Sequence, residues 1–475
     1  QLRHYDYILE DPLIDSWLDT LGTRLAANSD RPRQSFTFFT MRQREINAFA
    51  TLGGYIGVNA GLVLAAERED EVAAVLSHEI AHVTQQHVLR AVERAQQDQL
   101  PILLAMLGAI VAAQAAGGNS SDDAAQAAMV SAMGLMQQRQ IDYTRSNESE
   151  ADRLGIQTLS RSRYDTGAMA GFFSKMQAKS RANAAGYYGE TPGYLLTHPV
   201  NTTRISEAKA RAEQIARTPA GFTGDAGGGD SLLLPGGLKI SSQALGSGGT
   251  GQFEYARERL RVLSADSPAA AIREYERMAK SGKPSDAQRY GIAIAKLRAN
   301  QGAAAAAILA DLLEKHPGDL WLTLAFGEAE ARGGKADAAD ARFNALLRQT
   351  PQNRAVALTY ARVLAERNTV AAGKRAQALL RPLLGRSGED PEFQQVFARA
   401  SEIAGDPVRA GEAYAEAAYL NGRPEQALVQ LNTLKKRPEL DYYARARIDA
   451  RIAAITPTVL ELKRQGIRDE DLRRR

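Results

Sequence analysis

Apolar residues near the start of the chain recur at the spacing of a helix. Asp11-Pro12 is a favourable helix start, because the fixed backbone angle of proline suits the first helical turn. The apolar positions that follow are three or four residues apart: Ile14, Leu18, Leu21 and Leu25. This spacing predicts an amphipathic first helix that packs on the core of the N-terminal half.

The next stretch has the composition of short β-strands. Ser35 to Thr40 is rich in Phe and Thr, and Asn47 to Leu64 contains two further β-like pieces broken by Gly53-Gly54 and Gly61. We therefore expect a small sheet before the second long helix. Acidic residues mark the start of that helix, because they suit the positive end of its dipole: Glu69, Asp70 and Glu71.

Residues 101–136 contain two almost purely apolar segments. Pro101 to Ala116 and Ala124 to Met136 are separated by a polar break, which predicts a hydrophobic helical hairpin. Sixteen helical residues cover roughly 24 Å, less than the hydrocarbon core of a bilayer at about 30 Å, so the hairpin is not expected to span a membrane. It is either a buried part of the core, or a flexible lid or membrane-touching element. Four of the eight methionines lie in it and favour the second interpretation.

A segment rich in Gly, Ser and Pro divides the chain. Residues 218–252 have little periodic character, and we expect them to link a domain of residues 1–217 to a domain of residues 253–475.

The second domain carries a repeated pattern. Pro317 and Pro351 each close a pair of short helices and lie 34 residues apart, the period of tetratricopeptide repeats. Small and large apolar residues recur at matching positions: Ala271, Tyr275, Ala293, Ala305, Leu309, Gly327, Ala339 and Phe343. Pro391 follows 40 residues after Pro351, which predicts one irregular unit. About four to six repeats fit Phe253 to Gln465.

Composition limits the class of protein and its partners. At 475 residues the chain exceeds one ordinary core, and 44% apolar with 24% charged residues is typical of a soluble globular protein. The net charge of +4 is spread without a basic block, so nucleic acid is not an expected partner.

Because the chain has no cysteine, any metal must bind to His and carboxylate side chains. The opening at Gln1, with no targeting segment, leads us to expect that an export signal has been removed.

The segment His78-Glu79-Ile80-Ala81-His82 carries the candidate chemistry. His78 and His82 are four residues apart, so a helix places both imidazoles on one face, where they can bind one metal ion. Glu79 lies beside that ion and can take a proton from a metal-bound water. With only six histidines in the chain, chance is a poor explanation, and the pattern predicts a zinc metallopeptidase.

A catalytic zinc normally has three protein ligands and one open position, so one ligand must come from another segment. The best source is the acidic run Glu148-Ser149-Glu150-Ala151-Asp152. On a helix Glu148 and Asp152 share a face, from which Glu150 points away. Glu148 can then bind zinc, while Asp152 accepts the second N–H of one of the two histidines. The alternative is a solvated acidic face at a helix start.

These segments resemble the CAAX-prenyl-protease/HtpX class of zinc metallopeptidases, and within it the exported branch with C-terminal tetratricopeptide repeats. The resemblance spans most of residues 10–215 and is carried, in order, by Glu45 to Ala50, Gly53 to Leu64, Ser77 to Gln86, Glu148 to Gly155, and Leu196 to Ile205. It implies an α+β, mainly helical fold, in which a gluzincin-type metallopeptidase domain precedes an α-solenoid of tetratricopeptide repeats. It also implies one Zn²⁺ per chain, with Glu148 as the third protein ligand.

The family's integral-membrane members carry spanning helices near the active site. This chain has only the short hairpin of residues 101–136, which favours a soluble or peripheral enzyme.

The segment Leu196-Thr197-His198-Pro199 adds a regulatory hypothesis. In the exported branch the His of this motif can occupy the open position of the zinc and hold the enzyme silent, so the resemblance implies that His198 is a built-in switch. The residues alone indicate a loop histidine. Arg204 either steadies this loop or a substrate carboxylate, or forms a salt bridge on the following helix. The other histidines are not assigned to the metal: His4, His87 and His316.

The resemblance implies a zinc endopeptidase of the periplasm, soluble or peripherally associated with the membrane. Its expected substrates are misfolded or stalled periplasmic or outer-membrane proteins. The repeats would bind such clients or the machinery that assembles outer-membrane β-barrels. A strand edge within Asn47 to Val58 can pair with an extended substrate, although a structural strand is the default interpretation. Two alternatives stay open: a chaperone or scaffold for outer-membrane protein assembly with a mostly blocked zinc site, and a cytoplasmic regulator with a fortuitous motif.

Overall fold

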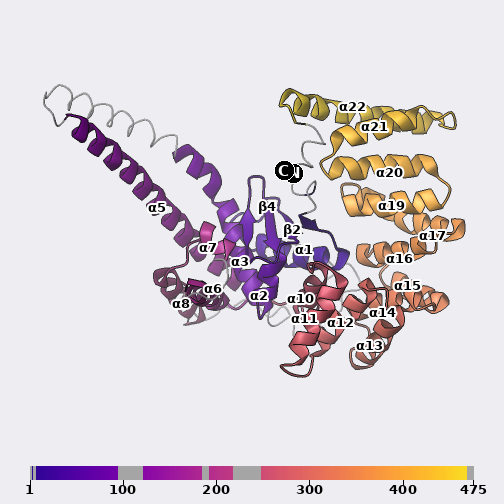
Figure 1. Cartoon of the computed structure of the whole chain (residues 1–475), viewed down its shortest axis with the longest axis horizontal. Coiled ribbons are helices and arrows are strands. Elements are labelled where there is room, and N and C mark those ends of the chain that lie inside the picture. The colour runs from indigo at the N-terminus through magenta and orange to yellow at the C-terminus, as the bar shows by residue number, and fades with distance from the viewer. Residues whose placement is uncertain (1–2, 4–6, 95–120, 185–191, 218–247, 468–475) are drawn as a thin grey trace, which may run out of the picture.

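The computed structural model describes residue 3 and residues 7–94, 121–184, 192–217 and 248–467. A small sheet surrounded by helices comes first along the chain, and a long stack of paired helices follows (Figure 1). The α+β, mainly helical fold class expected from the sequence is thereby confirmed. Most of the expected linker lies outside the described residues.

The sheet has four strands within the described residues, in the order β1-β2-β4-β3. β2 (Thr37–Met41) pairs in parallel with β4 (Tyr55–Asn59), and β4 pairs antiparallel with β3 (Ala48–Ala50), so β3 is an edge strand. The second predicted β region contains β3 and β4, but its last part forms the short helix α2 (Ala60–Ala65). The sequence does not predict β1 (Ile8–Leu9), because two residues are too few to show an alternating pattern.

Two helices pack around this sheet. α1 (Pro12–Ala27) lies against β2 and buries the apolar face that its sequence predicts. The side chain of Asp11 caps it by accepting hydrogen bonds from Leu13 N and Ile14 N, both at 3.2 Å. α3 (Glu69–Thr84) begins at the predicted acidic residues and is buried along most of its length.

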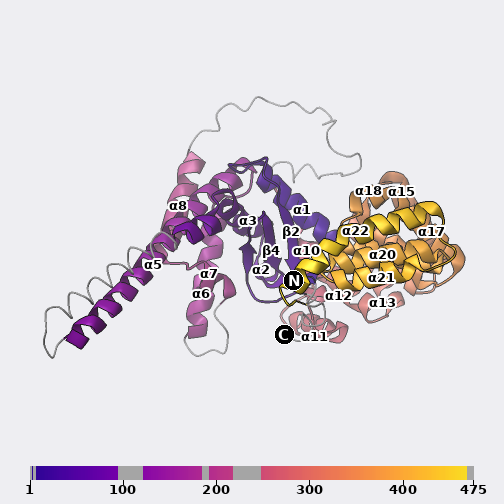
Figure 2. The same cartoon turned by 90° about the horizontal axis from the view of Figure 1, so that it is seen from above.

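Three further long helices are described in the N-terminal part. α5 (Ser121–Arg161) and α6 (Ala168–Ala184) pack against α3, and α8 (Thr202–Arg217) packs against both of them. Gly155 lets α5 approach α3 closely, since a Cβ at this position would lie 3.2 Å from the backbone nitrogen of His78. The first half of α5 projects beyond the body of the protein (Figures 1 and 2).

The predicted apolar hairpin is described only in part. Its second segment lies in α5, and its first segment lies within residues 95–120, outside the described residues. In the part of the chain that the structure describes, no helix combines the length and the apolar character needed to cross a bilayer.

Residues 253–464 form six consecutive pairs of helices. The pairs are α10 (Phe253–Leu263) with α11 (Pro268–Ala279), α12 (Asp286–Arg298) with α13 (Gly302–Lys315), α14 (Leu320–Arg332) with α15 (Ala336–Gln349), α16 (Arg354–Glu366) with α17 (Val370–Leu380), α19 (Pro391–Ile403) with α20 (Pro407–Leu420), and α21 (Pro424–Lys435) with α22 (Tyr442–Arg464). The short helices η1 (Arg381–Leu383) and α18 (Leu384–Ser387) lie between α17 and α19, where the proline spacing lengthens. Small residues sit at the close contacts: a Cβ on Gly327 would lie 2.8 Å from the ring of Phe343.

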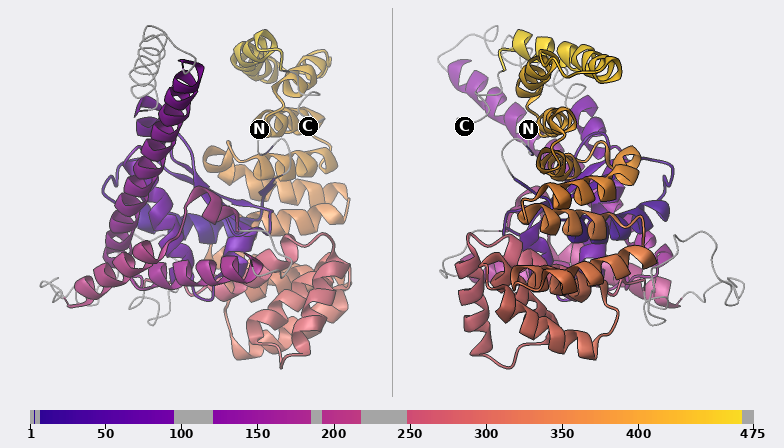
Figure 3. Two further views of the ribbon diagram at one scale, coloured as in Figure 1. Left: turned by 60° about the vertical axis from the view of Figure 1, so that its left-hand side comes forward. Right: turned by 90° about the vertical axis from the view of Figure 1, so that its right-hand side faces the viewer.

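The stack packs directly on the N-terminal part, beside which it curves (Figure 3). α10 contacts both α1 and α2, and one hydrophobic cluster contains core residues of the sheet region and of the first pairs of helices. At this contact the rings of Trp17 and Phe253 have centroids 6.4 Å apart.

A buried ion pair reinforces the same contact. Arg259 on α10 donates two hydrogen bonds to Asp11, from Nε to Oδ1 at 2.8 Å and from Nη2 to Oδ2 at 2.7 Å. Burial raises the pKa of the Asp11 carboxyl, but the positive charge and hydrogen bonds of Arg259 lower it by more, so the pKa lies below its ordinary value. Asp11 therefore caps α1 and holds α10 at the same time.

We expect Arg259→Met to destabilise the protein by roughly 3–5 kcal/mol, because it leaves the Asp11 carboxylate buried and unpaired. The control is Arg217→Met, which removes a pair with Glu213 whose side chains are 81% and 66% exposed and should cost about 0–1 kcal/mol. Chemical denaturation of both variants measures the difference. Equally small losses would show that the Asp11–Arg259 pair contributes no more than a surface pair.

Candidate metal centre

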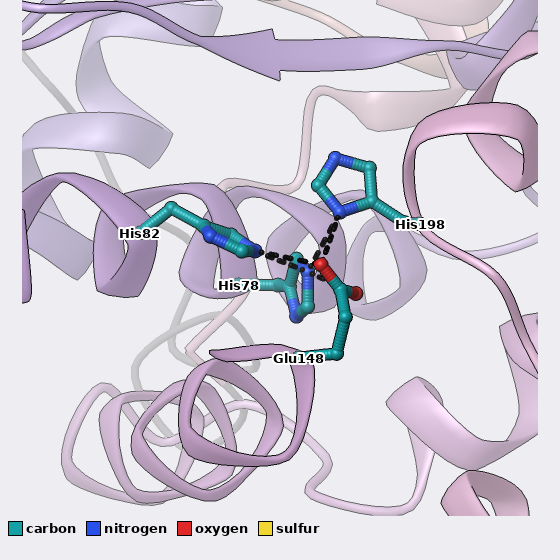
Figure 4. A group of neighbouring side chains, drawn as sticks. All are labelled: His78, His82, Glu148 and His198. Atoms are coloured by element: carbon teal, nitrogen blue, oxygen red, sulfur yellow. Dashed lines mark hydrogen bonds and ion pairs between the residues drawn. The ribbon is translucent and has the colours of Figure 1, made fainter. Parts of the chain in front are cut away.

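α3 and α5 bring three of the predicted side chains together. His78 and His82 lie one turn apart on α3, and their Nε2 atoms are 2.9 Å apart. Glu148 on α5 faces both: its Oε2 lies 3.4 Å from His78 Nε2, and its Oε1 lies 3.4 Å from His82 Nε2 (Figure 4). The separation of four residues therefore places both imidazoles on one face of α3, as the sequence predicts. Glu148 of the acidic run faces them across the contact between α3 and α5.

His198 joins this group from the segment that follows α7 (Gly193–Thr197). Its Nδ1 lies 2.9 Å from Glu148 Oε1 and 3.4 Å from His78 Nε2 (Figure 4). One donor atom from each of His78, His82, Glu148 and His198 lies within 4.8 Å of the others, and all four residues are buried. We call these four residues the donor cluster.

The donor cluster fits a metal ion chemically. Imidazole nitrogens and a carboxylate oxygen are ligands that Zn²⁺ prefers, and four of them match its usual coordination number. The pKa values of the two α3 histidines are shifted in opposite directions. Burial lowers the pKa of His78, but Glu148 and Asp152 raise it to about 10. Burial and the charge on His78 lower the pKa of His82 to about 3. The site thus favours a positive charge at its centre, which a bound cation supplies while displacing the proton.

Glu79 lies beside the donor cluster and is 1% exposed. Its Oε1 is 3.5 Å from His198 Nε2 and has no hydrogen-bond partner within the described residues. Burial raises the pKa of the Glu79 carboxyl above its ordinary value, while His198, His78 and a hydrogen bond from the backbone of Ala50 act against this increase. A buried carboxylate with a raised pKa next to a metal position is suited to accept and return a proton.

Asp152 and Arg204 support His78 from behind. Asp152 Oδ1 lies 2.9 Å from His78 Nδ1, the nitrogen that faces away from the donor cluster. Arg204 donates to both oxygens of Asp152 at 2.8 Å, and its Nη1 donates to the carbonyl oxygen of Pro199 at 2.9 Å. The guanidinium also lies over the ring of Phe173, 4.7 Å from its centroid. Because Arg204 is buried and held in this way, the geometry favours a role in steadying the His198 loop over binding a substrate carboxylate.

His87 contacts the donor cluster in a way that helical spacing does not predict. Its Nδ1 lies 2.8 Å from Nδ1 of His82, and its Nε2 lies 3.0 Å from Glu150 Oε2. α3 ends at Thr84, and Gln86 adopts a positive φ of 56°, so the chain turns and brings His87 back toward the helix. No signal in the sequence marks this turn, because glutamine is not a residue type that favours it. Burial lowers the pKa of His87, which favours its neutral form.

The structure also places Glu150 and His316, which the sequence analysis did not assign to the metal. Glu150 points away from the donor cluster, as expected from its position on the helix, and binds His87 and Arg90. His316 lies on the surface and pairs with Asp286 at 3.0 Å, and His4 is outside the described residues. Tyr194, which the sequence analysis does not single out, is fully buried and stacks on the imidazole of His198 with centroids 4.7 Å apart.

Comparison with known proteins agrees with this geometry. Residues 12–212 match the model of Peptidase family M48. A beta-barrel assembly-enhancing protease of Yersinia pestis is 32% identical over 453 residues, which cover 95% of this chain and 85% of the relative. The protein of the same name from Escherichia coli (strain K12) is 28% identical over the same shares. The mitochondrial metalloendopeptidase OMA1 of Schizosaccharomyces pombe is 25% identical over 182 residues, 38% of this chain and 48% of the relative.

The fold and the donor cluster, taken with these matches, define a metallopeptidase. The chain belongs to peptidase family M48. The resemblance of the sequence to this class of metallopeptidases is thereby confirmed. Its similarity to the members with a long helical C-terminal region is confirmed as well.

We expect Asp152→Asn to weaken metal binding by about 10–100-fold, because the neutral amide loses the charge that orients His78 and binds Arg204. Asp142→Asn is the control, since Asp142 lies on the same helix with a side chain that is 60% exposed. Competition with a chelator measures the affinity of each variant. Equal affinities would exclude a supporting role for Asp152.

Proposed function

We propose that this protein is a zinc-dependent endopeptidase with one Zn²⁺ per chain, which hydrolyses peptide bonds of misfolded or stalled periplasmic or outer-membrane proteins. The observation that carries the proposal is the donor cluster with Glu79 beside it. The relatives named beta-barrel assembly-enhancing proteases support the connection to outer-membrane proteins. The proposed place of action is the periplasm, where the protein would be soluble or peripherally bound to the membrane.

In this proposal His78, His82 and Glu148 hold the ion, and Asp152 keeps the imidazole of His78 in place. A bound zinc would polarise the scissile carbonyl and lower the pKa of a water molecule. The carboxylate of Glu79 would accept a proton from the attacking water and donate it to the nitrogen of the leaving amine. The buried position of Glu79 suits this exchange, because its raised pKa lies closer to neutrality than that of an exposed glutamate.

The edge strand β3 offers a place for the substrate backbone. Within the described residues it pairs only with β4, so its other edge can accept an extended polypeptide. β3 packs against α3, and the backbone of Ala50 in β3 is close enough to Glu79 to lower the pKa of its carboxyl, so a segment paired with this edge would run near that carboxylate. Only an unfolded segment can adopt such a strand, which favours misfolded or unassembled clients over compact proteins.

The domain boundaries follow from the same proposal. A peptidase domain of residues 1–217, a linker of residues 218–252 and a repeat domain of residues 253–475 would divide the chain. The six helix pairs support a tetratricopeptide-like domain, because stacked pairs bury a continuous core and leave an extended surface for clients or for the assembly machinery.

His198 is proposed to act as a switch. Its Nδ1 lies in the donor cluster, so it would occupy the position that a catalytic water needs and hold the enzyme silent. Client binding would then have to withdraw the segment that carries His198. The same contact favours the alternative function, a chaperone or scaffold whose zinc site is mostly blocked.

We expect Glu79→Gln to retain its metal and to lose at least about a hundredfold in turnover, because an amide cannot act as a general base. The test incubates the zinc-loaded protein and the variant with an unfolded outer-membrane β-barrel protein and identifies new chain termini by mass spectrometry. Cleavage at the same rate by both proteins would remove Glu79 from this role. Absence of new termini with the wild-type and with His198→Ala would favour the scaffold.

We expect His198→Ala to raise basal proteolysis about tenfold or more, because a minor open state of 0.1–10% would become the resting state. His316→Ala controls for the loss of a histidine, since His316 lies on the surface away from the donor cluster. Cleavage of an unfolded protein and self-cleavage are both measured at equal zinc content. Unchanged or lower activity of His198→Ala would show that His198 positions substrate or structure and is not a switch.

A further inference from the structure

We propose that His87 is a positioning residue of the metal centre, which fixes the imidazole of His82 by linking it to Glu150. The inference rests on the proposed metal site. It assigns a role to a histidine that lies outside the donor cluster and takes no part in the proposed chemistry.

The contacts form one continuous chain away from the donor cluster. Nε2 of His82 faces Glu148 Oε1 at 3.4 Å, and its other nitrogen, Nδ1, lies 2.8 Å from His87 Nδ1. Nε2 of His87 lies 3.0 Å from Glu150 Oε2. Arg90 donates to the same oxygen of Glu150 at 3.1 Å. Each group in the chain therefore contacts the next at hydrogen-bond distance.

Only one arrangement of protons satisfies all of these contacts when a metal is bound. Nε2 of His82 must offer its lone pair to the ion, so Nδ1 of His82 carries the proton and donates it to His87. Nδ1 of His87 is then the acceptor, and its proton lies on Nε2, which donates to the carboxylate of Glu150. The negative charge at the end of the chain thus selects the tautomer of both imidazoles.

The turn at Gln86 directs His87 toward the protein interior. Gln86 adopts a left-handed conformation with a φ of 56°, which is uncommon for residues other than glycine. This turn directs His87 inward, where it is 3% exposed, while its neighbour Val88 is 43% exposed.

The arrangement repeats the support of the other α3 histidine. His78 is backed by Asp152, and Arg204 holds that carboxylate. His82 is backed through His87 by Glu150, and Arg90 holds that carboxylate. Both carboxylates come from the turn of α5 that also supplies Glu148. One short segment would therefore supply a ligand and orient the other two.

The test measures metal binding by the full-length protein, with Zn²⁺ in chelator competition and with Co²⁺ for its visible absorption spectrum. We expect His87→Phe, which keeps a ring but removes the acceptor, to bind Zn²⁺ about 10–100-fold more weakly and to change the Co²⁺ spectrum. His87→Asn should recover part of the affinity, because its Oδ1 can accept from His82 Nδ1. Val88→Ala, a change at the exposed neighbour, should bind as the wild-type does.

Glu150→Gln provides an independent variant, because it keeps the shape of the side chain and removes its charge. Like His87→Phe, it should weaken Zn²⁺ binding. If His87→Phe does not fold, the test is made with Glu150→Gln. A folded His87→Phe or Glu150→Gln protein with wild-type affinity and an unchanged Co²⁺ spectrum would reduce His87 to a packing residue. Wild-type protein that binds neither ion would overturn the proposed metal site itself, which is a different result.

Discussion

The burial of convergent donor groups between α3 and α5 is the constraint on which the rest of the structure depends. His78, Glu79 and Glu148 are each at most 3% exposed, so water cannot solvate their charges. Buried charges without partners cost several kcal/mol each, and partners must therefore be supplied inside the protein. The close approach of the two helices, which Gly155 permits, brings these partners within reach. A metal ion among these groups would be a further partner for their buried charges.

Arg204 connects the buried charges between α3 and α5 to the segment that carries His198. One guanidinium holds both oxygens of Asp152 and also the carbonyl oxygen of Pro199, the residue next to His198. The support of His78 and the position of the His198 loop therefore share a single side chain. Withdrawal of the loop must break the hydrogen bond to Pro199, but it can leave the ion pair with Asp152 intact. Movement of this segment is thus compatible with an unchanged pairing of Arg204 with Asp152.

The helix stack is also connected to α3, the helix that carries His78 and His82. Glu69, at the start of α3, accepts hydrogen bonds from the indole Nε1 of Trp17 at 3.2 Å and from the hydroxyl of Tyr164 at 3.0 Å. It also accepts from the backbone nitrogen of Thr250 at 2.7 Å, just before α10. The first residues of α3 are thereby fixed by a segment that leads into the stack. With the Asp11–Arg259 pair, this contact makes the first helix pairs part of the same packed body as α3.

The sequence by itself determined the features that depend on local spacing: helices α1 and α3, the two histidines of α3 on one face, Glu148 on a helix, and the repeated pairs of helices. Local spacing did not determine the contacts of His198, Arg204 and His87: only the family resemblance implied a place for His198 at the metal, and the tertiary structure decided which atoms of these three residues meet which partners. His198 and His78 are 120 residues apart, so their meeting depends on how α3, α5 and α8 pack, which no periodic pattern encodes. His87 is near in sequence, but a single backbone turn at Gln86 reverses its direction. Hydrophobic periodicity records which face of an element is buried, and it carries no information about which buried side chains then meet.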